Sequence, residues 1–162
     1  MNSPVVFLDI DGVLNSRADL DLMRIGHISS LKFFKGGDFI CKYKLKRLQK
    51  FLDEIDARVV MVSSWFWGDP KTEKHVLENL DMIDFLGLTS RTLLVSKHTG
   101  GGLGRGREVL RIVDTLDLKD WIVIDDAGSY MYEFGTHMIN GLVGLTDEDV
   151  EILKQRIKDG KH

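Results

Sequence analysis

Cysteine, long hydrophobic runs and an excess of either charge are all scarce in this sequence. Cys41 is the one cysteine among 162 residues, which excludes a disulfide framework and a cysteine-rich zinc site. No apolar run approaches the length needed to cross a bilayer, and the first residues lack a basic segment followed by an apolar core. We therefore expect a soluble protein of the reducing cytoplasm, with no membrane partner.

The small net charge of -3 provides no global field that would attract nucleic acid or a membrane, so any basic surface must be local. Hydrophobic residues make up 43% and charged residues 29% of the chain, a composition typical of soluble globular proteins. A chain of 162 residues is long enough to bury about 70% of its unfolded surface in one core. We expect residues 1–162 to form a single domain.

Short apolar runs separated by helical patterns predict the fold class. The runs that begin at Val5, Ala57 and Trp121, and a weaker one at Thr136, are typical of buried parallel strands. Strands that alternate with helices predict an α/β fold, here a three-layer, Rossmann-like open parallel sheet with helices on both faces.

Apolar residues at helical spacing predict four helices. In the second of them, the spacing places Val76, Leu80 and Ile83 on one face. Thr146 can cap the last helix, in which acidic residues come first and basic residues last, as the helix dipole favours. The expected helices cover residues 44–55, 72–83, 107–116 and 146–160.

Polar side chains follow three of the predicted strands. Ligands of open parallel sheets bind at the carboxyl ends of the strands, so these side chains are expected to meet at one edge. The first strand is followed by two aspartates, the second by two serines and the third by two aspartates. They are Asp9 and Asp11, Ser63 and Ser64, and Asp125 and Asp126.

Four carboxylates gathered at one edge repel one another unless a cation lies among them. Oxygen ligands of this kind suit Mg²⁺, and a magnesium site beside hydroxyl and cationic groups suits a phosphate. Asp9 could then act as a nucleophile that forms an aspartyl-phosphate, while Asp11 acts as the general acid and base. The plainer alternative, a turn at Asp11 and Gly12, explains only one aspartate of the pair.

Four motifs in this order resemble those of the haloacid dehalogenase (HAD) superfamily of phosphatases, and the resemblance spans most of the chain. The motifs are the Asp-x-Asp-Gly motif in DIDGVL, a serine at the end of VVMVSS, a basic residue in GRGREVL and the acidic pair in VIDD. The resemblance implies a magnesium-dependent phosphomonoesterase that works through an aspartyl-phosphate on Asp9.

The resemblance also implies a role for each motif residue. Asp9 is the nucleophile and Asp11 the acid and base, Ser63 binds the transferred phosphoryl group, and Arg105 is the basic residue, with Arg107 and Lys97 as alternatives. The expected metal ligands are Asp9, Asp11 (through its backbone carbonyl), Asp125 and Asp126, and the expected substrate contacts are Gly12, Ser64, Trp65 and Arg107.

Two short insertions leave room for a minimal cap at most. Residues 15–43 could form a flap, and residues 88–104 form a shorter connection. An open site suits a nucleic-acid end or a phosphoprotein, unless a second subunit of a homo-oligomer covers the site. The layout is similar to the compact phosphatase domains of polynucleotide kinase-phosphatases and RNA-repair proteins, which implies a 3'-phosphate substrate.

Other functions stay open on the same residues. A phosphatase of nucleoside 5'-monophosphates or of other small metabolites is one alternative, and a module that binds phosphorylated ligands without turnover is another. A receiver domain is disfavoured, because receivers place the acidic pair on the first strand and the phosphate acceptor on a middle strand, which here ends in Ser63 and Ser64.

Three local features each allow two interpretations. Basic residues between Lys42 and Lys50 could follow a phosphate backbone, or form an ordinary solvated helix face. The aromatic residues 65–67 could offer a ring to a base, or fix a loop by burial. Asp19 and Asp21 repeat the spacing of the catalytic pair, but they follow no buried strand, so we expect both to be exposed.

Overall fold

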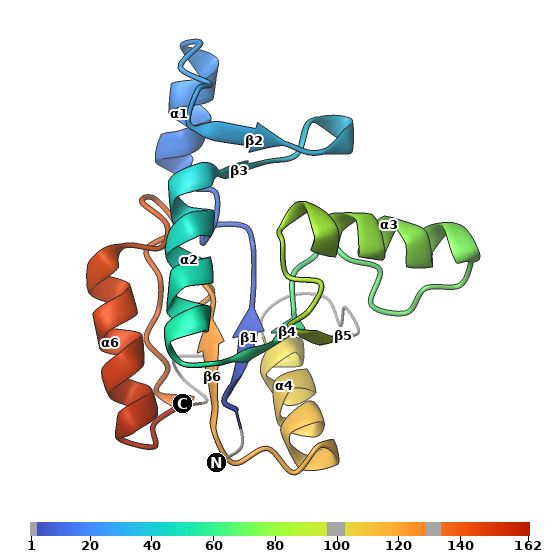
Figure 1. The fold of residues 1–162 in the computed structure, drawn as a ribbon, viewed down its shortest axis with the longest axis vertical. Coiled ribbons are helices and arrows are strands. Elements are labelled where there is room, and N and C mark those ends of the chain that lie inside the picture. Colours follow the sequence, from blue (N-terminus) through green and yellow to red (C-terminus); the bar gives the residue numbers. More distant parts are fainter. Residues whose placement is uncertain (1–2, 97–102, 129–133) are drawn as a thin grey trace.

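A four-stranded parallel sheet forms the centre of the computed structural model, which describes residues 3–96, 103–128 and 134–162 (Figure 1). Every neighbouring pair of strands in the order β5-β4-β1-β6 is parallel. The strands are β1 Val5–Leu8, β4 Arg58–Met61, β5 Thr92–Val95 and β6 Trp121–Ile124. The sheet confirms the predicted α/β fold and three of the four predicted strands.

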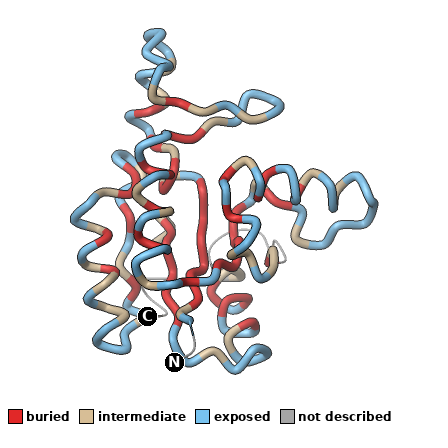
Figure 2. The backbone as a smooth tube through the Cα atoms, in the orientation of Figure 1, coloured by how far each residue is buried: buried red, intermediate tan, exposed pale blue. Residues whose placement is uncertain are grey.

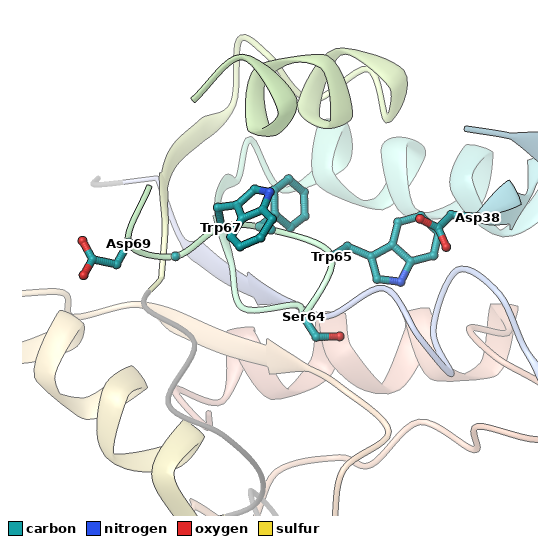
Figure 3. Close-up of a pocket in the computed structure, with 7 residues that line it drawn as sticks. Asp38, Ser64, Trp65, Trp67 and Asp69 are labelled. Atoms are coloured by element: carbon teal, nitrogen blue, oxygen red, sulfur yellow. The ribbon is translucent and has the colours of Figure 1, made fainter. Parts of the chain in front are cut away.

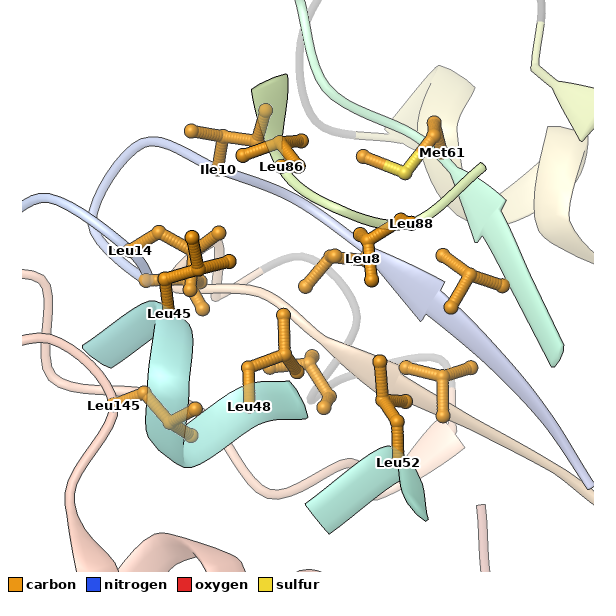
Figure 4. Close-up of a cluster of buried hydrophobic side chains, with 14 of the residues drawn as sticks. Leu8, Ile10, Leu14, Leu45, Leu48, Leu52, Met61, Leu86, Leu88 and Leu145 are labelled. Carbon is orange, nitrogen blue, oxygen red and sulfur yellow. The ribbon is translucent and has the colours of Figure 1, made fainter. Parts of the chain in front are cut away.

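Helices cover both faces of the sheet and create a core in two layers. Successive side chains of a strand point to opposite faces, so Leu8 of β1 packs in a cluster with Leu48 (Figure 4), whereas Phe7 packs in a second cluster with Val109. The helices are α2 Lys42–Glu54, α3 Glu73–Phe85 and α6 Asp147–Lys158 on the first side and α4 Leu103–Thr115 on the second.

The cap of Thr146 on α6 is confirmed in detail. The Thr146 hydroxyl accepts a hydrogen bond from the backbone N–H of Asp149, and the Asp149 carboxylate accepts one from the backbone N–H of Thr146. This reciprocal pair satisfies two backbone donors that a helix N-terminus otherwise leaves unpaired.

The insertion after β1 forms a small helix and a hairpin instead of a cap domain. It consists of α1 Arg17–Arg24, β2 Leu31–Phe33, a 3-10 turn η1 at Lys35–Gly37 and β3 Phe39–Cys41, with β2 and β3 antiparallel. These elements project beyond α2, away from the main body of the sheet (Figure 1).

The hairpin also reaches α3. The Phe34 and Phe85 rings lie 5.1 Å apart, and Lys35 pairs with Asp81 at 2.7 Å. The hairpin therefore contacts α3 directly, and a cavity opens between Asp38 of the hairpin and the loop that follows β4.

Asp19 is buried, so the expectation that it is exposed was wrong. Only 5% of Asp19 is accessible, and its carboxylate pairs with the equally buried Lys44 and accepts a hydrogen bond from the Ser16 hydroxyl. The Lys44 ammonium lies on α2, so this buried cluster attaches α1 to the core. Asp21 is exposed, as expected.

Two other expectations about the elements were wrong. Residues 136–140 form no strand, although the Ile139 N–H donates to the Asp125 carbonyl, just after β6, at 3.0 Å. Conversely, the connection expected over residues 88–104 contains strand β5, at the edge of the sheet. β5 is only four residues long, and its apolar run is too short to distinguish a strand from a connection.

The buried face of α3 agrees with the prediction at Ile83, which lies in the core, and differs from it elsewhere. Val76 and Leu80 are 43% and 52% exposed, whereas Asn79 and Met82 are buried. Much of α3 extends outward from the body (Figure 2), and Asn79 turns inward because its amide exchanges two hydrogen bonds of 2.8 Å with the backbone of Trp67. No described helix has the length and apolar character of a membrane span.

Candidate active site

The carboxyl edge of the sheet brings together two buried aspartates and one arginine. Asp9 follows β1 and Asp125 follows β6, and they are 3% and 2% exposed. Arg105, in the first turn of α4, donates through Nη1 to Asp9 Oδ2 at 3.1 Å and to Asp125 Oδ2 at 3.0 Å. One guanidinium thus bridges the ends of two strands that are neighbours in the sheet.

Burial makes these carboxylates costly to ionise. It raises the pKa of Asp9, against the opposing effects of Arg105 and of the Ser63 hydroxyl. Burial, followed by the negative charge of Asp9, raises the pKa of Asp125 from 3.8 to about 7. Burial also raises the pKa of Asp126, which is half-buried. Such raised values are typical of sites that await a cation or a charged ligand.

The acidic group fits a hard divalent metal ion. Asp9, Asp125 and Asp126 each offer a carboxylate oxygen, and these oxygens lie within 4.8 Å of one another. Asp9 Oδ1 is buried and has no hydrogen-bond partner among the residues that the structure describes. An unpaired oxygen inside a carboxylate cluster is a position that a hard divalent cation would satisfy.

The Asp126 carboxylate occupies space that is open because two neighbouring residues are glycines without side chains. A Cβ atom at Gly12 would lie 2.0 Å from Asp126 Oδ2, and one at Gly141 would lie 2.3 Å from the same atom. Gly12 also has a φ of +72°, in the left-handed region that favours glycine. Gly12 therefore gives room to a carboxylate of the acidic group, and the predicted contact of Gly12 with a substrate stays a prediction.

Asp11 lies outside this acidic group and is exposed. Its Oδ1 accepts two hydrogen bonds of 2.9 Å, one from Trp65 Nε1 and one from Asn15 Nδ2. The Asn15 amide oxygen in turn accepts the backbone N–H of Gly12 at 3.0 Å. The second carboxylate of the motif is therefore held by neutral donors, in contrast to Asp9.

The turn after β4 places Ser63 beside Asp9 and Ser64 in the wall of a cavity. Ser63 is 4% exposed, and a hydrogen bond from its hydroxyl favours the ionised form of Asp9. Its Oγ also accepts the backbone N–H of Trp65 at 3.3 Å. Ser64 faces the cavity described next.

A cavity of about 520 Å³ adjoins this turn, between residues 64–69 and Asp38 of the hairpin (Figure 3). The indoles of Trp65 and Trp67 form part of its wall, and no Lys or Arg lines it among the described residues. Phe66 is 5% exposed and anchors the loop, so the aromatic cluster divides between burial and the cavity wall.

A second cavity of about 320 Å³ lies on the other side of Asp11, toward α1. Its wall includes Asp126 and Gly141, and Arg17 supplies a cation that is 58% exposed. Two cavities therefore adjoin the motif. One has indole walls and lies beside Trp65, which donates to Asp11, and the other has Asp11 and the Arg17 guanidinium in its wall.

Other predicted residues lie farther from the chemistry. Arg107 is exposed, two positions beyond Arg105 on α4, and so points to a different side of the helix. Lys97 lies outside the described residues. Within the basic segment from Lys42 to Lys50, Arg47 makes a bidentate pair with Asp147 at 2.6 and 3.1 Å. This pairing and the burial of Lys44 engage two of the basic side chains within the fold, so Lys44 departs from the solvated face expected by the second interpretation. Binding of a phosphate backbone by the remaining lysines stays a prediction.

Sequence reasoning missed Asn15 and the hydrogen bond from Trp65 to Asp11. Asn15 stands four residues after Asp11 in a segment without clear periodicity, and Trp65 is 54 residues away from Asp11. Asn15 could have been noticed because Asn side chains commonly cap nearby backbone amides. The target of an indole N–H depends on the tertiary fold, and no local pattern predicts it.

Comparison with known families adds one finding. The family model for the HAD domain in Swiss Army Knife RNA repair proteins matches residues 5–150. The match runs from β1 into the first turn of α6, and so includes every carboxylate of the site, Ser63 and Arg105. No curated protein and no solved structure gave a significant match.

Proposed function

Because this chain belongs to the family of HAD domains in Swiss Army Knife RNA repair proteins, we propose that it is a magnesium-dependent phosphomonoesterase acting on a nucleic-acid end. The observation that carries this proposal is the buried pair Asp9 and Asp125 bridged by Arg105, with Asp126 beside them. A nucleophile, a cation for phosphate oxygens and a metal site converge there.

Asp9, Asp125 and Asp126 would hold the metal ion. When bound, Mg²⁺ offsets the negative charge of the phosphate and of the carboxylates around it. The raised pKa of Asp125 is consistent with this role, since a cation is what would keep the buried carboxylate ionised at neutral pH. Arg105 and Ser63 provide further donors for the phosphoryl oxygens.

In the first step, a carboxylate oxygen of Asp9 attacks phosphorus and the bond from phosphorus to the leaving oxygen breaks. Asp11, in its protonated form, gives its proton to that leaving oxygen, so the product departs as a neutral hydroxyl. Asp9 is suited to attack because Arg105 and Ser63 favour its ionised form against the effect of burial.

In the second step, water releases the phosphate. The Asp11 carboxylate takes a proton from the water, whose oxygen attacks phosphorus. The bond between phosphorus and the Asp9 oxygen breaks, which restores the Asp9 carboxylate and leaves inorganic phosphate. Asp11 ends the cycle protonated, ready for the next leaving group.

The cavity beside Trp65 supports a nucleotide as the leaving group. Its wall has two indoles, and stacking of a base on an aromatic ring is worth about 1–3 kcal/mol. The RNA-repair family favours the end of an RNA strand, and we propose a 3'-phosphate as the substrate. The same cavity would accept a nucleoside 5'-monophosphate, which is the second candidate.

Phosphate release from a substrate panel tests this proposal. The panel contains one oligoribonucleotide with a 3'-phosphate, the same strand with a 5'-phosphate, nucleoside monophosphates and a sugar phosphate, each with Mg²⁺ and with EDTA. Highest kcat/KM on the 3'-phosphorylated strand is expected. Preference for free monophosphates would support the second candidate, and binding of all of them without release would indicate a binding module.

A further inference from the structure

One turn of the chain contacts both aspartates of the Asp-x-Asp motif. Residues 63–66 follow β4, and within them Ser63 favours ionised Asp9 while Trp65 donates its indole N–H to Asp11. The turn is anchored to the core by Phe66, which is 5% exposed and whose backbone N–H donates to the Ser63 carbonyl at 3.3 Å. The position of the indole is therefore set by the core.

The two donors on Asp11 meet the same oxygen. Trp65 Nε1 and Asn15 Nδ2 both lie 2.9 Å from Oδ1. An indole N–H can only donate. The Asn15 amide is oriented by the Gly12 backbone N–H, which donates to its oxygen and turns its NH₂ group toward Asp11. Neither partner can accept a proton from Oδ1.

We propose that Trp65, assisted by Asn15, is a positioning residue for the acid and base Asp11. Two donors occupy Oδ1 and so leave Oδ2 as the oxygen that holds the proton delivered to the leaving group. Trp65 also lines the cavity proposed for that group, so the residue that orients the acid contacts the group it protonates. This inference rests on the proposed phosphomonoesterase activity.

The chain offers a matched control in Trp67. It lines the same cavity, but its indole N–H donates to Glu78 Oε2 at 2.8 Å instead of to Asp11. Trp65→Phe and Trp67→Phe each remove one indole N–H from one cavity wall. Only the first change removes a donor from the acid.

A series of aryl phosphates separates positioning from substrate contact. General acid catalysis matters most for poor leaving groups, and all members of the series fill the cavity similarly. We expect kcat/KM of Trp65→Phe to depend more steeply on the acidity of the phenol than that of the wild type. The loss should be roughly ten- to a hundredfold for the least acidic phenol, as for one hydrogen bond to a charged group, and small for p-nitrophenol.

The control and a second background complete the kinetic test. Trp67→Phe should keep the wild-type slope, and Trp65→Phe should not change the slope further in the Asp11→Asn background, since Trp65 acts on the slope through Asp11. A loss of the same size for every member of the series, as expected of an indole in the cavity wall, leaves the slope unchanged. An unchanged slope in Trp65→Phe, an equal steepening in Trp67→Phe, or independent effects of Trp65 and Asp11 on the slope would each overturn the inference.

An NMR measurement decides the inference even without turnover. The indole N–H resonances of Trp65 and Trp67 are assigned from the two Phe variants, and Asp11→Asn is then compared with the wild type. We expect the Trp65 resonance to shift and the Trp67 resonance to stay. If the wild type hydrolyses no phosphate but the Trp65 resonance shifts, the proposed function fails and the contact stands; an unmoved Trp65 resonance refutes the contact itself.

Discussion

Replacing Asp125 with Asn should stabilise the metal-free protein above neutral pH. Asp125 is 2% exposed, and its pKa is raised from 3.8 to about 7, first by burial and then by the charge of Asp9. Between these two values, the folded protein holds a proton that the unfolded chain has released. Stability is therefore present at low pH and is lost as pH rises through this interval.

The size of this effect follows from the shift. Each pKa unit corresponds to about 1.4 kcal/mol, so ionising Asp125 costs the folded state up to about 4 kcal/mol by pH 8. Asn has the same shape and no charge, and its amide oxygen can still accept the Ala127 N–H, now bonded to Asp125 at 2.7 Å. It loses the hydrogen bond from Arg105, worth about 1.5–3 kcal/mol, which leaves a net gain of about 1–2.5 kcal/mol.

Urea unfolding in EDTA at pH 5 and pH 8 measures this prediction. The Asp125→Asn variant should be more stable than the wild type at pH 8, and its advantage should shrink at pH 5. Added Mg²⁺ should stabilise the wild type at pH 8 and leave the variant nearly unchanged. Two results together would refute the reasoning. The metal-free wild type would not lose stability from pH 5 to pH 8, and the Asp125→Asn variant would be less stable than the wild type at both pH values.

Two further substitutions test the surroundings of the site. Gly141→Ala should weaken Mg²⁺ binding several-fold in calorimetry, because its Cβ would displace Asp126. The control Gly128→Ala should bind Mg²⁺ normally, because its Cβ would lie 3.7 Å from its nearest neighbour. Equal affinities of the two variants would contradict the role given to Asp126. Lys44→Met should lower the free energy of unfolding by about 3–5 kcal/mol, because it leaves Asp19 buried without its cationic partner. A decrease in the free energy of unfolding below about 1 kcal/mol would mean that Asp19 reaches water in the variant.

The gathering of aspartates at the carboxyl edge of the sheet was predictable from the sequence, because apolar runs identify the strands and parallel strands end at one edge. Apolar runs identified β1, β4 and β6, and parallel strands present their carboxyl ends at one edge. The acidic pairs that follow these runs were therefore expected at one edge, and Asp9, Asp125 and Asp126 do lie together, whereas Asp11 lies outside the group. Thr146 was also predictable, since a helix cap is a local interaction.

The remaining features depend on partners that are distant in sequence. Asp19 is buried because Lys44 of another helix reaches it, and no pattern around residue 19 contains that information. The inward face of α3 is set by the bonds of Asn79 to the Trp67 backbone, which outweigh the apolar spacing of its neighbours. The indole of Trp65 likewise finds Asp11 only after β1 and β4 have paired.

Single-turnover labelling tests the covalent role of Asp9 most directly. The wild type and Asp9→Asn are mixed with Mg²⁺ and an oligoribonucleotide that has a radiolabelled 3'-phosphate, quenched in acid and digested to peptides. We predict transient label on the wild-type peptide that contains Asp9, removed by hydroxylamine as expected of an acyl phosphate, and none on the variant. Phosphate release without labelled protein, or label that persists in Asp9→Asn, would contradict the aspartyl-phosphate mechanism.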